Sequence, residues 1–177
     1  MAKKKIIEAE TFTNEMKVEF LNCDTVEKLR VFLNNYEIDN SDKFGNNILH
    51  YYLNNTKSFA LAWNIVIPEI LNTGLDIDKK QSKGEFGRTS LHIAIIQEEK
   101  DIAKYLIHQG ANIDAVDANG NSLIWTAVMK YNGDGYFIEM LIKNGADVYL
   151  ENNYEVSAID LAKSISNKDV AKYFDGK

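Results

Sequence analysis

Gly87-Arg-Thr-Ser-Leu-His-Ile-Ala94 returns 33 residues further along the chain as Gly120-Asn-Ser-Leu-Ile-Trp-Thr-Ala127. A third copy is Gly45-Asn-Asn-Ile-Leu-His-Tyr-Tyr52, and a shorter fourth copy is Val156-Ser-Ala-Ile-Asp-Leu-Ala162. Self-similarity at a fixed period of about 20 to 50 residues is the signature of a repeat protein, in which each unit buries its apolar face against its neighbours. The sequence therefore predicts an array of similar units.

A second signature follows each of the first three copies. It takes the forms Ile70-Leu71-Asn-Thr-Gly74-Leu-Asp-Ile77-Asp78, Leu106-Ile107-His-Gln-Gly110-Ala-Asn-Ile113-Asp114 and Leu141-Ile142-Lys-Asn-Gly145-Ala-Asp-Val148. The two motifs, in phase, resemble the ankyrin repeat, whose core motif T-P-L-H-x-A recurs about every 33 residues. The resemblance covers about residues 24–174, although the Pro of the motif is absent from every copy.

The resemblance implies an all-α fold, a solenoid of helix-turn-helix units with projecting β-turn fingers. We expect about four repeats behind a helical N-terminal cap, all in one domain spanning residues 1–177. The expected boundaries are an N-terminal cap at 1–39, repeats at 40–78, 79–114 and 115–149, and a C-terminal cap repeat at 150–177.

Each motif position that recurs in the copies has a physical reason for its residue type. The Asn, Thr or Ser that opens each copy can accept a hydrogen bond from a free helix N–H, so Asn47, Thr89, Ser122 and Ser157 are predicted helix N-caps. Glycine adopts positive φ without a steric penalty, so Gly74, Gly110 and Gly145 should end the second helices. Pro68 lies inside one such helical stretch, and we expect it to break the helix near Ile67.

Composition and charge narrow the possible classes of protein. With 45% hydrophobic and 26% charged residues, the 177-residue chain should fold, and its net charge of −6 argues against nucleic acid or an anionic membrane as partner. Lys3, Lys4 and Lys5 precede only two apolar residues, which is too short for a secretion signal, and no apolar run reaches the roughly 20 residues that span a bilayer. The single cysteine, Cys23, cannot form an internal disulfide. We expect a cytoplasmic protein.

The chain offers no convincing catalytic or metal-binding set. His50 and His92 occupy the His position of the motif, where the family uses the ring structurally, and Trp125 and Asp160 stand at the same position in the other copies. Cys23 has no Cys or His at ligand spacing. We therefore expect no catalytic residue, no metal and no cofactor.

The resemblance also implies a partner-binding face, because ankyrin-like domains usually bind proteins along the surface made by the fingers and the first helix of each repeat. The residues that the motif leaves free there are the predicted contacts. They are Asp42, Phe44, Lys79, Lys80, Lys83, Phe86, Ile96, Gln97, Asp117, Asn119, Met129, Lys130, Glu151 and Tyr154.

These observations favour a non-enzymatic protein-protein interaction module that is monomeric on its own. The resemblance to small bacterial ankyrin proteins suggests an immunity protein or an inhibitor of a toxin or effector, and a scaffold or regulatory subunit is the alternative. An enzyme would need a pocket of polar groups near Asp114, Asp117 and His92.

Overall fold

A computed structural model describes residues 12–165 and 169–176, so the expectation about Lys3, Lys4 and Lys5 lies outside the described residues. The chain divides into two compact units that meet in sequence between Gly84 and Glu85, and each is described by itself. Among the described residues, no helix is long and apolar enough to cross a membrane.

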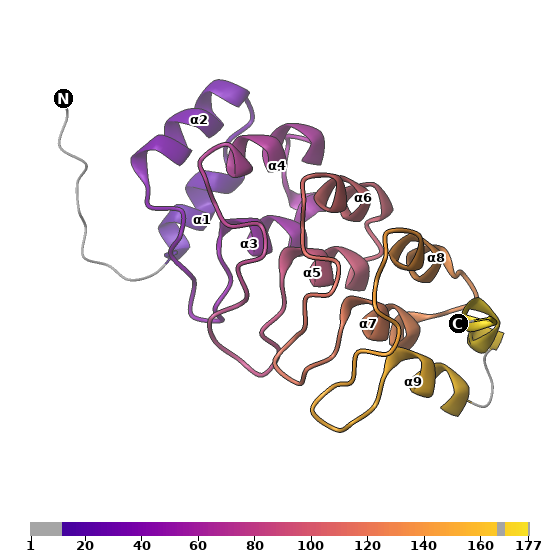
Figure 1. Ribbon diagram of the computed structural model, residues 1–177. Coiled ribbons are helices and arrows are strands. Elements are labelled where there is room, and N and C mark those ends of the chain that lie inside the picture. The colour runs from indigo at the N-terminus through magenta and orange to yellow at the C-terminus, as the bar shows by residue number, and fades with distance from the viewer. Residues whose placement is uncertain (1–11, 166–168, 177) are drawn as a thin grey trace. The chain divides into compact units, whose positions relative to one another are not determined.

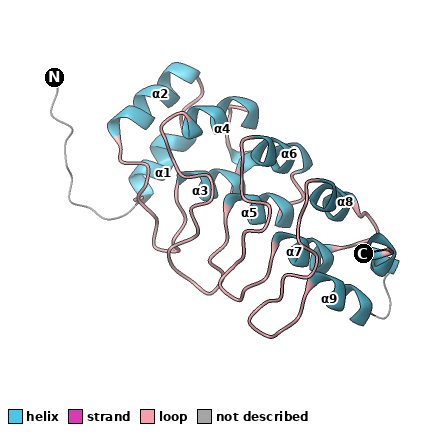
Figure 2. Cartoon of the chain, viewed as in Figure 1, coloured by secondary structure: helices cyan, strands magenta, loops and turns pink. Residues whose placement is uncertain are grey.

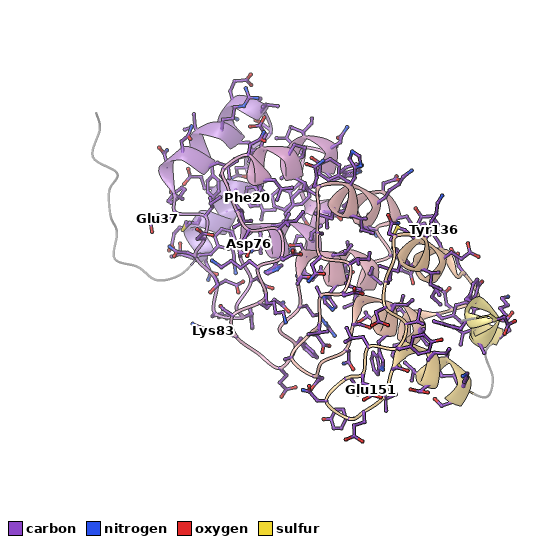
Figure 3. All side chains as sticks on the ribbon, viewed as in Figure 1. Phe20, Glu37, Asp76, Lys83, Tyr136 and Glu151 are labelled. Atoms are coloured by element: carbon purple, nitrogen blue, oxygen red, sulfur yellow. The ribbon has the colours of Figure 1, made fainter. Side chains whose placement is uncertain are left out.

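Unit 1, residues 12–84 as described, is built from two helix pairs around an aromatic core. Its helices are α1 (Asn14–Leu21), α2 (Val26–Asn35), α3 (Ile48–Asn54) and α4 (Trp63–Leu71), with a short 3-10 turn at Thr56–Ser58. The rings of Phe20 and Phe32 stack at 5.3 Å, and Phe59 lies 4.6 Å from the Phe20 ring. Aromatic packing of this kind joins the N-terminal helices to the first repeat, and Figure 3 labels Phe20.

Unit 2, residues 85–165 and 169–176, repeats a helix pair along the chain (Figure 1). Its helices are α5 (Ser90–Ile96), α6 (Lys100–His108), α7 (Leu123–Lys130), α8 (Tyr136–Lys143) and α9 (Ala158–Ser164), followed by the 3-10 helix η2 (Asp169–Phe174). The first helices α5, α7 and α9 pack in sequence, and α6 and α8 each pack on their own first helix. Buried Leu and Ile side chains alternate with small Ala94, Ala127 and Ala162, which let the helices approach closely.

The predicted N-caps are confirmed. The side chains of Asn47, Thr89, Ser122 and Ser157 each accept a hydrogen bond from the backbone N–H three residues later. In the first two, a histidine ring reaches back, so that Nδ1 of His50 accepts from the Asn47 N–H at 3.3 Å. The histidine of the motif thus completes a capping box.

The predicted glycine stops are also confirmed, but the predicted helix break is wrong. Gly74, Gly110 and Gly145 have φ values of 89°, 90° and 89° and stand two or three residues beyond the last residue of α4, α6 and α8. Helix α4 starts only at Trp63 and continues through Pro68 to Leu71. Proline removes one backbone hydrogen bond there, and burial of Ile67 and Ile70 holds the helix together across the gap.

The loops between the repeats contain no strand within the described residues, and Figure 2 shows helices and loops only. A single isolated bridge pairs Val116 with Ser122. The all-α ankyrin-type fold expected from the sequence is confirmed, whereas the repeat boundaries remain predictions.

Candidate functional site

Four loops, which we call fingers one to four, follow α2, α4, α6 and α8. They comprise residues 39–46, 78–88, 114–121 and 147–156, and finger two passes from unit 1 into unit 2. Fingers one, three and four each turn through a backbone hydrogen bond across four residues, as in Gly120 N–H to Asp117 O at 3.1 Å. These are β-turns, as the resemblance implied.

The prediction that Asp42 and Asp117 are free surface groups is wrong, because their carboxylates fold back into their own fingers. Asp42 is 2% exposed, and its Oδ1 accepts from the N–H groups of Phe44 and Asn46, both at 2.9 Å. Burial raises the pKa of Asp42, but Lys17, whose Nζ donates at 2.6 Å, and the two backbone N–H groups together lower it below its usual value. Asp117 makes the same turn contacts in finger three and is 8% exposed.

Backbone hydrogen bonds tie neighbouring fingers together. In unit 2 the Ala118 N–H donates to Phe86 O at 2.7 Å, and the Asn153 N–H donates to Asn119 O at 3.0 Å. Asn119, a predicted contact, is therefore half-buried in this ladder. The ladder holds fingers three and four in one fixed arrangement, which is what a preorganised binding surface requires.

The aromatic residues at the finger tips are exposed. Phe44 is 61%, Phe86 47% and Tyr154 73% exposed, and all three occupy the same position in their fingers. The Arg88 guanidinium lies 4.1 Å from the centre of the Phe86 ring, a cation-π arrangement that the sequence analysis missed. Burial lowers the pKa of Arg88, while the charge of Asp117 raises it.

The other predicted contacts divide by exposure. Lys80, Lys83, Gln97, Lys130 and Glu151 are exposed, and Lys83 and Glu151 are labelled on their fingers in Figure 3. Met129, at the end of α7, is 49% exposed. Two are less available: Ile96 is half-buried, and the Lys79 ammonium is held by Asp39, whose Oδ1 lies at 3.3 Å.

Unit 2 carries an acidic finger surface. Fingers three and four contain no Lys or Arg but five acidic residues, of which Asp147, Glu151 and Glu155 are exposed. Among the described residues, none of these five carboxylates forms an ion pair with a Lys or Arg. Tyr149, 56% exposed and also overlooked, adds a second aromatic ring to finger four. The signal in the sequence was an aromatic residue directly after buried Val148, in the turn at the start of finger four.

His50 and His92 serve the fold. Burial lowers the pKa of His50 to about 4, so the ring is neutral near pH 7 and its Nδ1 can accept the capping hydrogen bond. Burial also raises the pKa of the Cys23 thiol, which disfavours the nucleophilic thiolate. Within residues 12–165 and 169–176, no group of three His, Cys, Asp or Glu side chains is placed to hold a metal ion.

A separate hollow lies on the outer side of unit 2, between α6 and α8. Its volume is about 660 Å³, and Lys104, Ile107, Tyr136, Met140 and Lys143 contribute to its lining. The hollow is formed by second helices, away from the fingers, so substitutions there provide a control for substitutions on the finger surface.

Comparison with known families settles the class of the chain. The family description "Ankyrin repeats (3 copies)" matches residues 16–117 and 59–152, which together cover most of the sequence. The chain belongs to the ankyrin-repeat family. Its members carry repeats that generally act in protein-protein interaction rather than catalysis.

Similar proteins come from distant sources. An ankyrin repeat protein of Rickettsia bellii is 34% identical over 83 residues, 46% of this chain and 12% of that protein. The ankyrin repeat protein OPG189 of Variola virus is 30% identical over 122 residues, 67% of this chain and 21% of that protein. Alpha-latroinsectotoxin-Lt1a of Latrodectus tredecimguttatus is 34% identical over 71 residues, 40% of this chain and 5% of that protein. The chain thus spans only a small part of each of these relatives.

Proposed function

We propose that this chain is a non-enzymatic cytoplasmic module that binds a protein partner through its fingers and first helices. The observation that carries the proposal is the set of large apolar side chains exposed on one rigid framework in unit 2, namely Phe86, Met129 and Tyr154. Aromatic and methionine side chains are enriched at the centres of protein interfaces. The buried, hydrogen-bonded finger turns fix the backbone that presents them.

The charge of the fingers supports a partner with a basic binding segment. Fingers three and four have no Lys or Arg to neutralise exposed Asp147, Glu151 and Glu155. Complementary charge across an interface accelerates association and excludes like-charged competitors. Exposed Tyr149 and Tyr154 can also accept Lys or Arg groups over their ring faces.

Two roles fit such a module. As an immunity protein or an inhibitor of a toxin, it would abolish the partner's activity on binding; as a scaffold or regulatory subunit, it would leave that activity present or modulated. Assay of the captured partner with and without the chain separates the two roles.

The test begins with capture of partners from lysate on the immobilised chain, followed by identification and direct affinity measurement. A triple variant, Phe86→Ala, Met129→Ala and Tyr154→Ala, should retain its helical circular dichroism but bind the partner much more weakly. Loss of one central interface side chain costs about 2 kcal/mol, or roughly thirtyfold in Kd. The affinity of the wild type should also fall as salt rises, because the acidic groups are exposed to screening.

The matched control changes Lys104→Ala and Lys143→Ala in the outer hollow. We expect this variant to bind like the wild type. If the control loses the partner while the triple variant keeps it, the outer hollow is the binding site and the proposed surface is wrong.

A further inference from the structure

Three Asn-Gly pairs occur in the chain, at Asn119, Asn132 and Asn144, and glycine follows each directly. In such a pair the backbone nitrogen of the glycine can attack the amide carbon of the asparagine, because glycine has no side chain to hinder the approach. The reaction is the same in all three pairs. What differs between them is the state of the attacking N–H.

Two of the pairs are held in place by hydrogen bonds from their glycine N–H. The Gly120 N–H donates to Asp117 O at 3.1 Å within the turn of finger three. The Gly145 N–H donates to Ile142 O at 3.0 Å at the end of α8, where the Asn144 side-chain amide also donates to Met140 O at 2.7 Å. A nitrogen committed to a carbonyl in this way must first lose that bond before it can attack.

The pair Asn132-Gly133 is arranged differently. Both residues are exposed in the turn between α7 and α8, and Gly133 has a φ of 108°. Among the described residues, no hydrogen bond from the Gly133 N–H is present. The Asn132 Oδ1 accepts from the Asp134 N–H at 3.2 Å, which folds the side chain over the Gly133 peptide.

We propose that Asn132 is a site of spontaneous deamidation in the folded protein, with the backbone nitrogen of Gly133 as nucleophile. A bond forms between that nitrogen and Cγ of Asn132 while the bond from Cγ to Nδ2 breaks. The nitrogen's proton and the amide leave together as ammonia, and a five-membered imide remains. Water then adds to either carbonyl of the imide and opens it, giving aspartate or isoaspartate, with no change of oxidation state.

The product changes the local charge and the backbone. The Asn132 Nδ2 donates to Glu98 Oε1 at 3.3 Å, and a carboxylate at this position repels Glu98 instead. The exposed Asp134, paired with Lys100 at 2.5 Å, lies two residues further on and faces the added charge as well. Isoaspartate also inserts a methylene group into the main chain four residues before Tyr136 starts α8. Deamidation therefore acts as a slow, irreversible charge switch in this turn.

Peptide mapping can follow the three sites separately. Trypsin cleaves after Lys104, Lys130, Lys143 and Lys163, so the three asparagines fall in the peptides 105–130, 131–143 and 144–163. The folded protein is incubated in mildly alkaline buffer, and the mass of each peptide and its labelling by an isoaspartate methyltransferase are measured over time. We expect conversion at Asn132 at least about tenfold faster than at the other two sites, a difference of about 1.4 kcal/mol in the barrier.

Two controls make the result decisive. In urea the three pairs should convert at similar rates, because unfolding frees every glycine N–H. The variant Asn132→Ser keeps an oxygen for the turn but lacks the amide, so its peptide 131–143 should neither gain the mass of an acid nor become labelled. The proposal fails if Asn119 or Asn144 converts as fast as Asn132 in the folded protein. It also fails if Asn132 is unchanged after the unfolded chain has reacted.

Discussion

Replacing Gly120 by alanine tests whether finger packing, rather than turn geometry alone, requires glycine. Gly120 has a φ of 77°, and a Cβ atom there would lie 2.8 Å from the backbone nitrogen of Asn153 and 3.1 Å from Cα of Asn152. The first distance is too short for a carbon, and the neighbour is backbone, which cannot turn aside as a side chain can. Finger four must therefore shift away from finger three.

The size of the effect follows from four contributions. Alanine at positive φ costs about 1 kcal/mol or slightly more. Displacement of finger four breaks the hydrogen bond from the Asn153 N–H to Asn119 O, which contributes about 1 kcal/mol, and strain in the packed backbone adds about 1–2 kcal/mol. Alanine also has less conformational freedom than glycine in the unfolded chain, which offsets about half a kcal/mol of this destabilisation. The free energy of unfolding should fall by about 2–4 kcal/mol.

Gly145→Ala is the matched control, because it shares the backbone strain but not the collision. Gly145 has a φ of 89°, and a Cβ there would meet nothing within 4 Å. Its cost should stay near 1 kcal/mol. Urea unfolding followed by far-UV circular dichroism measures both variants, and thermal melting should show a loss of roughly 2–4 °C for each kcal/mol. Equal losses in the two variants would refute the claim that finger four imposes the glycine.

Three other changes probe the core, a buried histidine and the last finger. Leu91→Asp puts a carboxylate at a 1% exposed site of α5 and should cost several kcal/mol; a melting temperature within about two degrees of wild type would contradict the packing described. Burial lowers the pKa of His50 from 6.5 to about 4, so the unfolded chain binds the proton first on acidification. The free energy of unfolding should therefore fall by roughly 3 kcal/mol in all as the pH drops from 6.5 to about 4. His50→Gln should flatten this pH dependence in urea titrations, and an unchanged pH dependence would exclude His50 as its source. Glu155→Gly removes the backbone strain of a non-glycine residue at a φ of 59° and should raise the free energy of unfolding by about 0.5–1 kcal/mol in the same assay. A lower free energy of unfolding would show that the Glu155 side chain contributes to stability.

The helix starts and stops could be read from the sequence because their causes are local. An N-cap such as Thr89 needs only an oxygen and the N–H groups of the next three residues, and Gly110 needs only a positive φ. Both features depend on only a few consecutive residues. The packing residues followed from the repeat, since one copy fixes the register of the others.

The fate of the acidic finger residues could not be read in the same way. Asp42 and Asp117 lie in loops at positions where the repeat motif specifies no residue type, and polar residues in loops are ordinarily exposed to solvent. Their burial depends on the path of the backbone, which brings the N–H groups of residues two and four positions later onto one carboxylate oxygen. In finger four Asn152 makes the same contacts through its amide oxygen, so the position requires an acceptor rather than a charge.

Glu155 connects the packing of the fingers to the surface proposed for binding. It takes the turn position that Gly45 and Gly120 occupy in fingers one and three, and at both glycines a Cβ would collide with the backbone of the next finger. Among the described residues, the Glu155 side chain is exposed and the backbone there has a φ of 59°. Tyr154, the residue before it, is the most exposed of Phe44, Phe86 and Tyr154. Because an exposed ring contributes little to packing within the fold but much to an interface that buries it, Tyr154→Ala should weaken partner binding far more than it lowers the free energy of unfolding.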